Sequence, residues 1–167
     1  SERGDNAWMA YGLSGDPDVR YFRRRPLGQF SSGQRRAGIL VLVNYALPSE
    51  LDEFGQAYEA WRQAIKEHVT GLGGRLLPGY SRILRVVFGV PISFENDLIR
   101  AAEAALAIRE SFPQTKMCLA DADVLSVGVD VRSPDLFRLE GGLESADFGI
   151  LVDPTAIKPL GHRACLL

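Results

Sequence analysis

The sequence predicts an α+β domain, a ferredoxin-like βαββαβ fold of the palm type with one or more extra strands near its C-terminal end. Three observations support this fold class. Residues 38–46 are almost wholly apolar, residues 50–70 and 95–111 are amphipathic, and residues 73–89 have the pattern of a hairpin. We therefore expect a mainly antiparallel sheet with its helices on one face.

The composition is that of one globular domain. The chain has 167 residues, of which 46% are hydrophobic and 24% charged, enough to form a core without disulfide or metal support. Its net charge of −2 does not favour nucleic acid or an anionic membrane as a partner. The two cysteines, Cys118 and Cys165, fit no metal-ligand spacing. We expect two reduced thiols in a cytoplasmic protein rather than one disulfide.

Residues 1–36 differ from the remainder, being polar and rich in arginine, and we interpret them as an N-terminal arm or linker that precedes a domain at 37–167. The cluster Arg23, Arg24 and Arg25 is typical of a solvated segment. It is also typical of the cytoplasmic side of a membrane helix. Because the chain does not begin with Met, a tether to a membrane segment outside this chain is one hypothesis.

The first strand and helix follow from residue type and spacing. Residues 38–46 have no polar face, which indicates a central strand buried on both sides. Ser49 is the predicted N-cap of the first helix, with Asp52 three residues later. Apolar residues then recur every three or four positions, which places them on one helix face: Leu51, Phe54, Tyr58, Trp61, Ile65 and Val69.

The remaining elements follow from turn residues and alternation. Pro78 and Gly79 mark the turn of the hairpin, whose return strand spans residues 83–88. Ser93 or Asn96 is expected to cap the second helix, and a polar connection follows at 113–123. Residues 124–132 and 136–140 are predicted to form a second hairpin, and 148–152 a last strand. Asp153 is expected to cap a short final helix.

Four blocks in this order resemble the class III adenylate/guanylate cyclase domains. They are the apolar strand at 39–43, the Gly-Gly to Val-Phe-Gly hairpin at 73–89, the Phe-Gly-Val-Pro segment at 88–91 with the alanine-rich helix after it, and the segments at 127–129 and 147–153. The resemblance covers about residues 38–160. It implies a head-to-tail dimer in which two aspartates hold two catalytic metals. A lysine and a polar residue select the purine, and an Asn and an Arg on the last helix stabilise the transition state.

This chain has other residue types where that family has these groups. The positions of the two metal-binding aspartates fall on Asn44 or Tyr45 and on Arg82. An amide oxygen is a poor ligand for a hard cation beside a carboxylate, and an arginine repels a cation. The lysine and last-helix positions have no polar side chain and fall on Pro78, Ala156 and Leu160. We expect no catalytic residue, no bound metal and no cofactor.

The leading hypothesis is a catalytically inactive cyclase-like domain that serves as a regulatory, dimerisation or protein-interaction module of a signalling protein. Its partner would be a second copy or another protein domain. One alternative is a nucleotide-binding sensor in which Arg82, Arg85 and Asp153 contact the nucleotide, although the arginines would equally suit solvated or ion-paired positions. The other is an active purine-nucleotide cyclase whose metal ligands are displaced to Asp52, Asp97 or Asp130. Because the family continues with a further strand, we expect the domain to be truncated at its C-terminus or completed by a partner.

Overall fold

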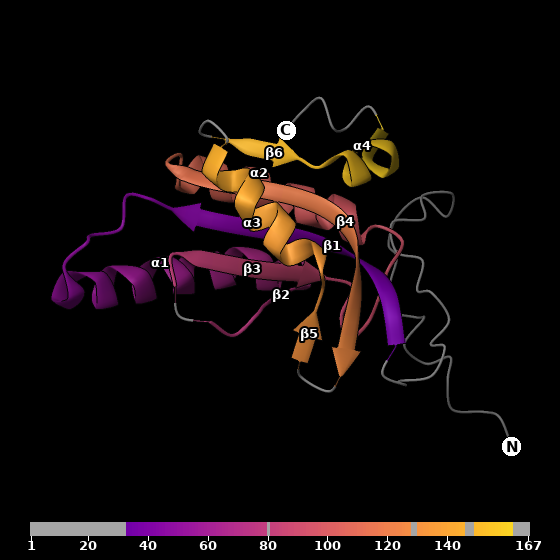
Figure 1. Ribbon diagram of the computed structural model, residues 1–167, viewed down its shortest axis with the longest axis horizontal. Helices are drawn as coiled ribbons and strands as arrows, with labels where there is room; N and C mark the ends of the chain where they lie inside the picture. Colours follow the sequence, from indigo (N-terminus) through magenta and orange to yellow (C-terminus); the bar gives the residue numbers. More distant parts are fainter. Residues whose placement is uncertain (1–32, 80, 128–129, 146–148, 162–167) are drawn as a thin grey trace, which may run out of the picture.

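The computed structural model describes residues 33–79, 81–127, 130–145 and 149–161, and within these ranges the predicted fold class is confirmed (Figure 1). The first six elements follow the order βαββαβ. The elements are β1 (Gly33–Asn44), α1 (Leu51–Gly71), β2 (Gly74–Leu76), β3 (Ile83–Phe88), α2 (Asp97–Ser111), β4 (Thr115–Val127), β5 (Asp130–Arg132), α3 (Asp135–Ser145), β6 (Ile150–Val152) and α4 (Pro154–Leu160).

The strands form one sheet in the order β2-β3-β1-β4-β5, with β6 paired to β4. Only the β4–β6 pairing is parallel among the described strands, so the sheet is mainly antiparallel as predicted. The central strand is β1. It pairs with β4 along its whole length, from Gly33 opposite Ser126 to Asn44 opposite Thr115, and with β3 from Gly38 to Val43.

Helices cover both faces of this sheet. Leu40 and Leu42 of β1 belong to a core shared with α1, α2 and α4. The intervening residues Ile39, Val41 and Val43 belong to a second core, which includes Leu139 and Leu143 of α3. Figure 1 shows α3 crossing the near face of the sheet, with α1 and α2 behind it. The expectation of helices on one face is correct for three helices and wrong for α3.

The structure corrects two strand predictions in the second half of the chain. Residues 115–123, predicted to be a polar connection, form the first part of β4 and are mostly buried against β1. Residues 136–140, predicted to be a strand, lie in α3, where Leu136, Leu139 and Leu143 recur at helical spacing towards the sheet. The predicted strand at 124–132 is divided between β4 and β5. Residues 128–129 and 146–148 lie outside the described ranges.

Two boundaries also differ from the prediction. The first strand begins at Gly33, inside the segment assigned to the arm, because its N-terminal half pairs with Ala122–Ser126 as part of the same ladder. The first helix begins at Leu51 with Glu50 as the N-cap residue, and neither Glu50 nor Ser49 supplies a side-chain capping bond to it. Residues 1–32 lie outside the described ranges, so the interpretation of most of the arm is not tested. No helix in the described ranges combines the length and apolar character that crossing a bilayer requires.

Gly38 allows α2 to approach the central strand closely. A Cβ atom at Gly38 would lie 3.1 Å from the carbonyl oxygen of Asp97 and 3.1 Å from the Cα of Leu98, which are the first two residues of α2. Both are backbone atoms, so the helix as a whole would have to shift. By contrast, a Cβ atom at Gly71, the last residue of α1, would meet nothing within 4 Å.

We therefore expect Gly38→Ala to lower the free energy of unfolding by about 1–3 kcal/mol, because it overpacks the contact between β1 and α2. Gly71→Ala is the matched control and should leave stability unchanged or raise it by up to about 1 kcal/mol, since alanine favours a helix. Urea denaturation followed by circular dichroism measures both. Equal stability of the two variants would contradict this account of the interface.

Candidate functional site

The two positions that the resemblance assigns to metal-binding aspartates lie side by side at one edge of the sheet. The backbone N–H of Asn44, the last residue of β1, donates to the carbonyl oxygen of Arg82, 3.3 Å away, just before β3. The preceding pair in the ladder is Val43 opposite Ile83. Asn44 and Arg82 are therefore directly opposite each other, and their side chains leave the sheet on the same face.

Asn44 uses its amide oxygen locally. The side chain is buried, and its Oδ1 accepts a hydrogen bond of 2.9 Å from the backbone N–H of Ala46, which turns the chain after β1. The neighbouring Tyr45 is 46% exposed, and the Nζ of Lys116 lies 5.1 Å from the centre of its ring. The amide oxygen of Asn44 thus accepts a hydrogen bond within the turn that follows β1, and the side chain of Tyr45 is partly exposed.

The guanidinium of Arg82 is fixed against the segment that leads into α1. Its Nη2 donates to the carbonyl oxygen of Pro48 at 2.9 Å, and its Cζ lies 5.5 Å from the centre of the Phe54 ring. A charged donor contributes about 1.5–3 kcal/mol per hydrogen bond, and a cation over an aromatic ring about 0.5–1 kcal/mol at an exposed site. Arg82 therefore ties the start of β3 to the start of α1.

Tyr58 holds the hairpin turn in place, a role that sequence reasoning missed. Its side chain is fully buried on α1, and its hydroxyl donates to the carbonyl oxygen of Gly79 at 2.9 Å. From its spacing alone, this tyrosine is predicted only as part of the apolar stripe of the first helix. A buried tyrosine hydroxyl needs a hydrogen-bond partner, which is the signal in the sequence that could have indicated a contact of this kind.

The structure does not bring Arg82 and Arg85 together. Arg82 lies on the α1 side of the sheet, whereas Arg85 points to the α3 side, where its Nε lies 2.5 Å from the Oε1 of Glu140. The pair is partly buried, with 28% of the Arg85 side chain and 15% of the Glu140 side chain exposed. A shared phosphate contact of the two arginines stays a prediction, and this geometry does not favour it.

Asp153 is the N-cap of α4, as predicted. Its Oδ1 accepts hydrogen bonds from the backbone N–H of Thr155 at 3.0 Å and from the Thr155 hydroxyl at 2.6 Å, and its other oxygen accepts from Arg138 of α3. Behind this cap, Ala156 and Leu160 are buried in the core that α4 shares with α2. The two positions where the cyclase domains have an Asn and an Arg on the last helix thus carry buried apolar side chains in this chain.

The electrostatics around Asp153 involve three groups. Burial raises the pKa of Asp153, but the hydrogen bonds from Arg138 and Thr155 more than offset this and leave the pKa below its ordinary value of 3.8. The same hydrogen bond raises the pKa of Arg138. Burial, with a smaller contribution from the charge of Asp153, raises the pKa of the free thiol of Cys118 to about 11, so this thiol is unreactive at neutral pH.

The acids considered as displaced metal ligands lie on separate parts of the fold. Asp97 is buried and accepts from the Ser93 hydroxyl at 2.9 Å and the Phe94 N–H at 2.8 Å, besides its ion pair with Arg100. Asp52 is exposed at the start of α1, and Asp130 is exposed on β5. Within the ranges that the structure describes, no three His, Cys, Asp or Glu side chains are grouped to hold a metal.

Comparison with known proteins supports the fold but not a sequence relationship. No known family profile matches the sequence, and no curated protein is significantly similar to it. Among solved structures, a dimeric guanylyl cyclase domain of the RhoGC fusion protein from the aquatic fungus Blastocladiella emersonii matches with a TM-score of 0.67 and 9% identity, over 77% of this chain and 85% of that one.

Two further cyclases match similarly. The adenylyl cyclase CyaB from P. aeruginosa has a TM-score of 0.64 and 10% identity over 77% of this chain and 81% of its own. The guanylyl cyclase Cya2 has a TM-score of 0.63 and 18% identity over 79% and 81%. The chain therefore has the fold of the class III nucleotide cyclase catalytic domains, which confirms the fold that the sequence resemblance implied.

The Arg138–Asp153 contact gives a pH-dependent prediction. Because folding lowers the pKa of Asp153, its ionised form stabilises the fold above pH 3.8, and this contribution is lost as the pH falls through the folded value. Asn caps a helix about as well as Asp, so Asp153→Asn removes mainly the charge. We expect a loss of about 1–3 kcal/mol at pH 7, since a buried partner of an arginine is removed.

The loss relative to the unmodified chain should shrink when urea denaturation is repeated at pH values below 3.8. Asp130→Asn, at an exposed position on β5, is the control and should change stability little at either pH. A difference for Asp153→Asn that is independent of pH would show that the charge of Asp153 does not stabilise the fold.

Proposed function

We propose that this domain is a catalytically inactive relative in fold of the nucleotide cyclases, and that it acts as a regulatory, dimerisation or protein-interaction module of a signalling protein. The observation that carries the proposal is the position of Arg82. Its guanidinium lies against Pro48 and Phe54, on the same face of the sheet as Asn44 and directly opposite it. A cation is built into the edge where a metal pair would need carboxylates.

Binding a divalent ion at this edge would be unfavourable in two ways. The Arg82 side chain would have to leave the Pro48 carbonyl and the Phe54 ring, losing contacts worth about 2–4 kcal/mol together. Its charge would also repel the ion, and the oxygen of Asn44, which already accepts from the Ala46 N–H, carries no negative charge to offset this. No charge compensation comes from either position, since neither is a carboxylate.

The positions that bind the nucleotide in the cyclase domains also carry unsuitable side chains in this chain. Transition-state stabilisation of a triphosphate requires positioned cationic or polar donors. The side chains of Ala156 and Leu160 offer none and are buried. The exposed side of Pro78, at the position of the base-selecting lysine, offers no hydrogen-bond donor. The domain thus suits neither the metal-binding nor the nucleotide-positioning half of a dimer.

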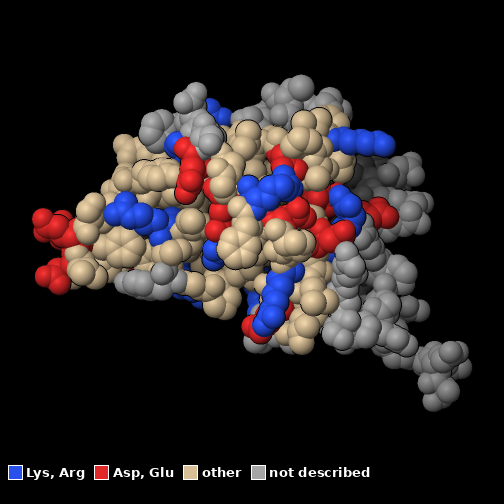
Figure 2. All heavy atoms as spheres, viewed as in Figure 1, with Lys and Arg blue, Asp and Glu red and all other residues tan. Residues whose placement is uncertain are grey.

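An interaction role is supported by apolar side chains on the α3 side of the sheet. Phe137 of α3 is 83% exposed and Leu151 of β6 is 42% exposed. A Cβ atom at Gly142 would lie 3.8 Å from a methyl group of Leu151, so α3 and β6 are neighbours on this surface. Figure 2 shows acidic and basic residues interspersed on this face, which suits a protein partner better than a polyanion. The partner is a second copy or another protein domain.

The first test is enzymatic. The purified chain, incubated with ATP or GTP and Mg²⁺ or Mn²⁺, should form no cyclic nucleotide measurable by liquid chromatography and mass spectrometry, because the edge lacks metal ligands. Turnover that disappears in Asn44→Ala would contradict the proposal and support an active cyclase. Turnover that persists in Asn44→Ala but disappears in Asp97→Asn would support displaced ligands.

The second test adds the missing ligands. Because residues 44 and 82 are directly opposite each other on one face, the double variant Asn44→Asp, Arg82→Asp places two carboxylates side by side. We expect it to bind Mn²⁺ at least about tenfold more tightly than the unmodified chain, as two carboxylates replace an amide and a cation. Isothermal titration calorimetry measures the affinity. Arg82→Gln is the control and should gain little; strong Mn²⁺ binding by the unmodified chain would overturn the proposal.

A further inference from the structure

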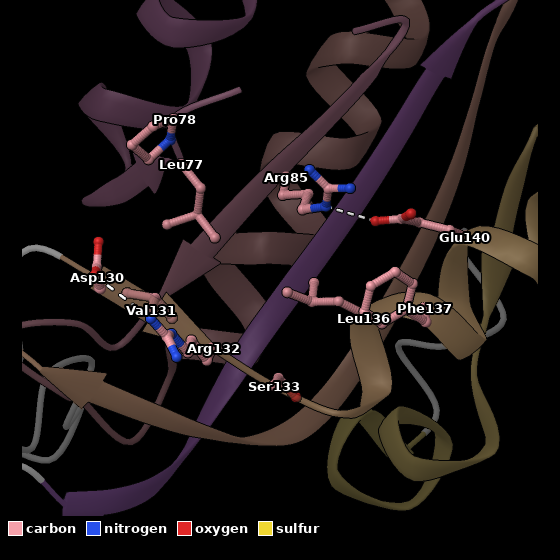
Figure 3. A pocket seen from close by; sticks show the side chains of 10 residues that line it. All are labelled: Leu77, Pro78, Arg85, Asp130, Val131, Arg132, Ser133, Leu136, Phe137 and Glu140. Atoms are coloured by element: carbon pink, nitrogen blue, oxygen red, sulfur yellow. Dashed lines mark hydrogen bonds and ion pairs between the residues drawn. The ribbon is translucent and has the colours of Figure 1, made fainter. Parts of the chain in front are cut away.

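A cavity of about 390 Å³ lies between α3, β5 and the end of the β2–β3 hairpin (Figure 3). Its size falls in the range of pockets that hold small molecules. Leu77 and Pro78 form one wall, and Leu136 and Phe137 form part of another. The cavity is separate from the edge at Asn44, because the side chain of Arg85 enters it from the α3 side of the sheet, opposite to Arg82.

Arg85 is the group in this cavity best placed to fix a ligand. It rises from the middle of β3, with 28% of its side chain exposed, and its Nε is held by Glu140 at 2.5 Å. Figure 3 shows this ion pair on the cavity wall. A guanidinium has five N–H donors, of which this bond uses one, so its terminal nitrogens can meet an anion. The bond to Glu140 also orients the guanidinium in advance of binding.

The charges around the cavity favour an anion with a single negative charge. Two positive residues, Arg85 and Arg132, and two negative residues, Asp130 and Glu140, line it, so their charges cancel. A polyphosphate would bring several negative charges close to two carboxylates with no excess of cations. A single carboxylate can instead join Arg85 opposite to Glu140, as the second acceptor of one arginine.

The apolar walls indicate the body of the ligand. The Pro78 ring is a rigid apolar surface and the Phe137 ring a flat aromatic one, and Phe137 is 83% exposed although it lines the cavity. An aromatic group is favourable between such surfaces because it buries their area and stacks on the Phe137 ring. We propose that this cavity binds a small aryl monocarboxylate, with the carboxylate on Arg85 and the aromatic body against Pro78, Leu136 and Phe137.

The probe for this proposal is 2-naphthoate, with 2-naphthalenemethanol as its neutral isostere and ATP as a polyanion. Saturation-transfer NMR and calorimetry on the full chain measure binding. We expect 2-naphthoate to bind at least about tenfold more tightly than the alcohol, the contribution of one charge-assisted contact. ATP should not displace it. Equal affinity for the acid and the alcohol, or displacement by ATP, would overturn the proposal.

Three variants locate the site. Arg85→Met should weaken 2-naphthoate binding at least about tenfold, since it removes the guanidinium and keeps the length of the side chain. Arg82→Met makes the same change three residues earlier on the opposite face and should leave the affinity unchanged. Phe137→Ala removes an exposed ring without touching the core and should weaken binding about threefold or more.

Arg85→Met leaves Glu140 without its ion-pair partner. If that variant unfolds for this reason, Phe137→Ala still tests the site. Unchanged affinity in Phe137→Ala, or an equal loss in Arg82→Met and Arg85→Met, would overturn the assignment. The result does not depend on the proposed function, because neither catalysis nor metal binding enters it. A chain that forms cyclic nucleotide and also binds 2-naphthoate through Arg85 would refute the first proposal and support this one.

Discussion

The fold depends on burying β1 on both faces at once. Five consecutive residues from Ile39 to Val43 are at most 4% exposed, and they alternate between the core under α1 and α2 and the core under α3. Such a strand has to be paired on both edges, since its backbone groups are out of reach of water. Pairing with β3 and β4 satisfies them. The two neighbours in turn place the hairpin turn and the start of β4 beside the end of β1.

Sequence reasoning could locate this strand because its apolar run has no polar face, and it could locate the hairpin because Pro78 and Gly79 mark a turn. It could not recognise the strand that pairs with it on the other edge. In β4, Lys116, Asp121 and Asp123 resemble a loop, but their charges are accommodated by contacts distant in sequence, such as the bond of Asp121 to Arg36 at 2.9 Å. The polar and arginine-rich residues 33–36 likewise resemble the arm, although they pair with β4.

The sequence does not predict the helix α3, because the turn residues at 133–135 favour a hairpin and because Gly141 and Gly142 have low helix propensity. In the structure, Gly142 faces Leu151 of β6, and packing of Leu139 and Leu143 against the sheet outweighs the propensity. The packing of α3 against the sheet also positions the charged residues Arg138 and Glu140 of that helix. Arg85 pairs with Glu140 across 55 residues and Arg138 with Asp153 across 15, and no local pattern predicts either contact. The resemblance singled out positions 44, 82, 156 and 160, but it did not predict the contacts of the side chains there.

The edge at Asn44 and Arg82 also explains how a cyclase fold can be stable there without a metal ion. Two carboxylates directly opposite each other repel, and without a metal one of them tends to protonate. With Arg82 and Asn44 in these positions there is no like-charge pair. The guanidinium instead joins the start of β3 to Pro48 and Phe54, while Tyr58 joins α1 to the hairpin turn at Gly79. Both contacts are independent of metal and nucleotide. Under the proposed function, these parts of the fold therefore need neither Mg²⁺ nor nucleotide to hold together, which is what a module that acts through contact requires.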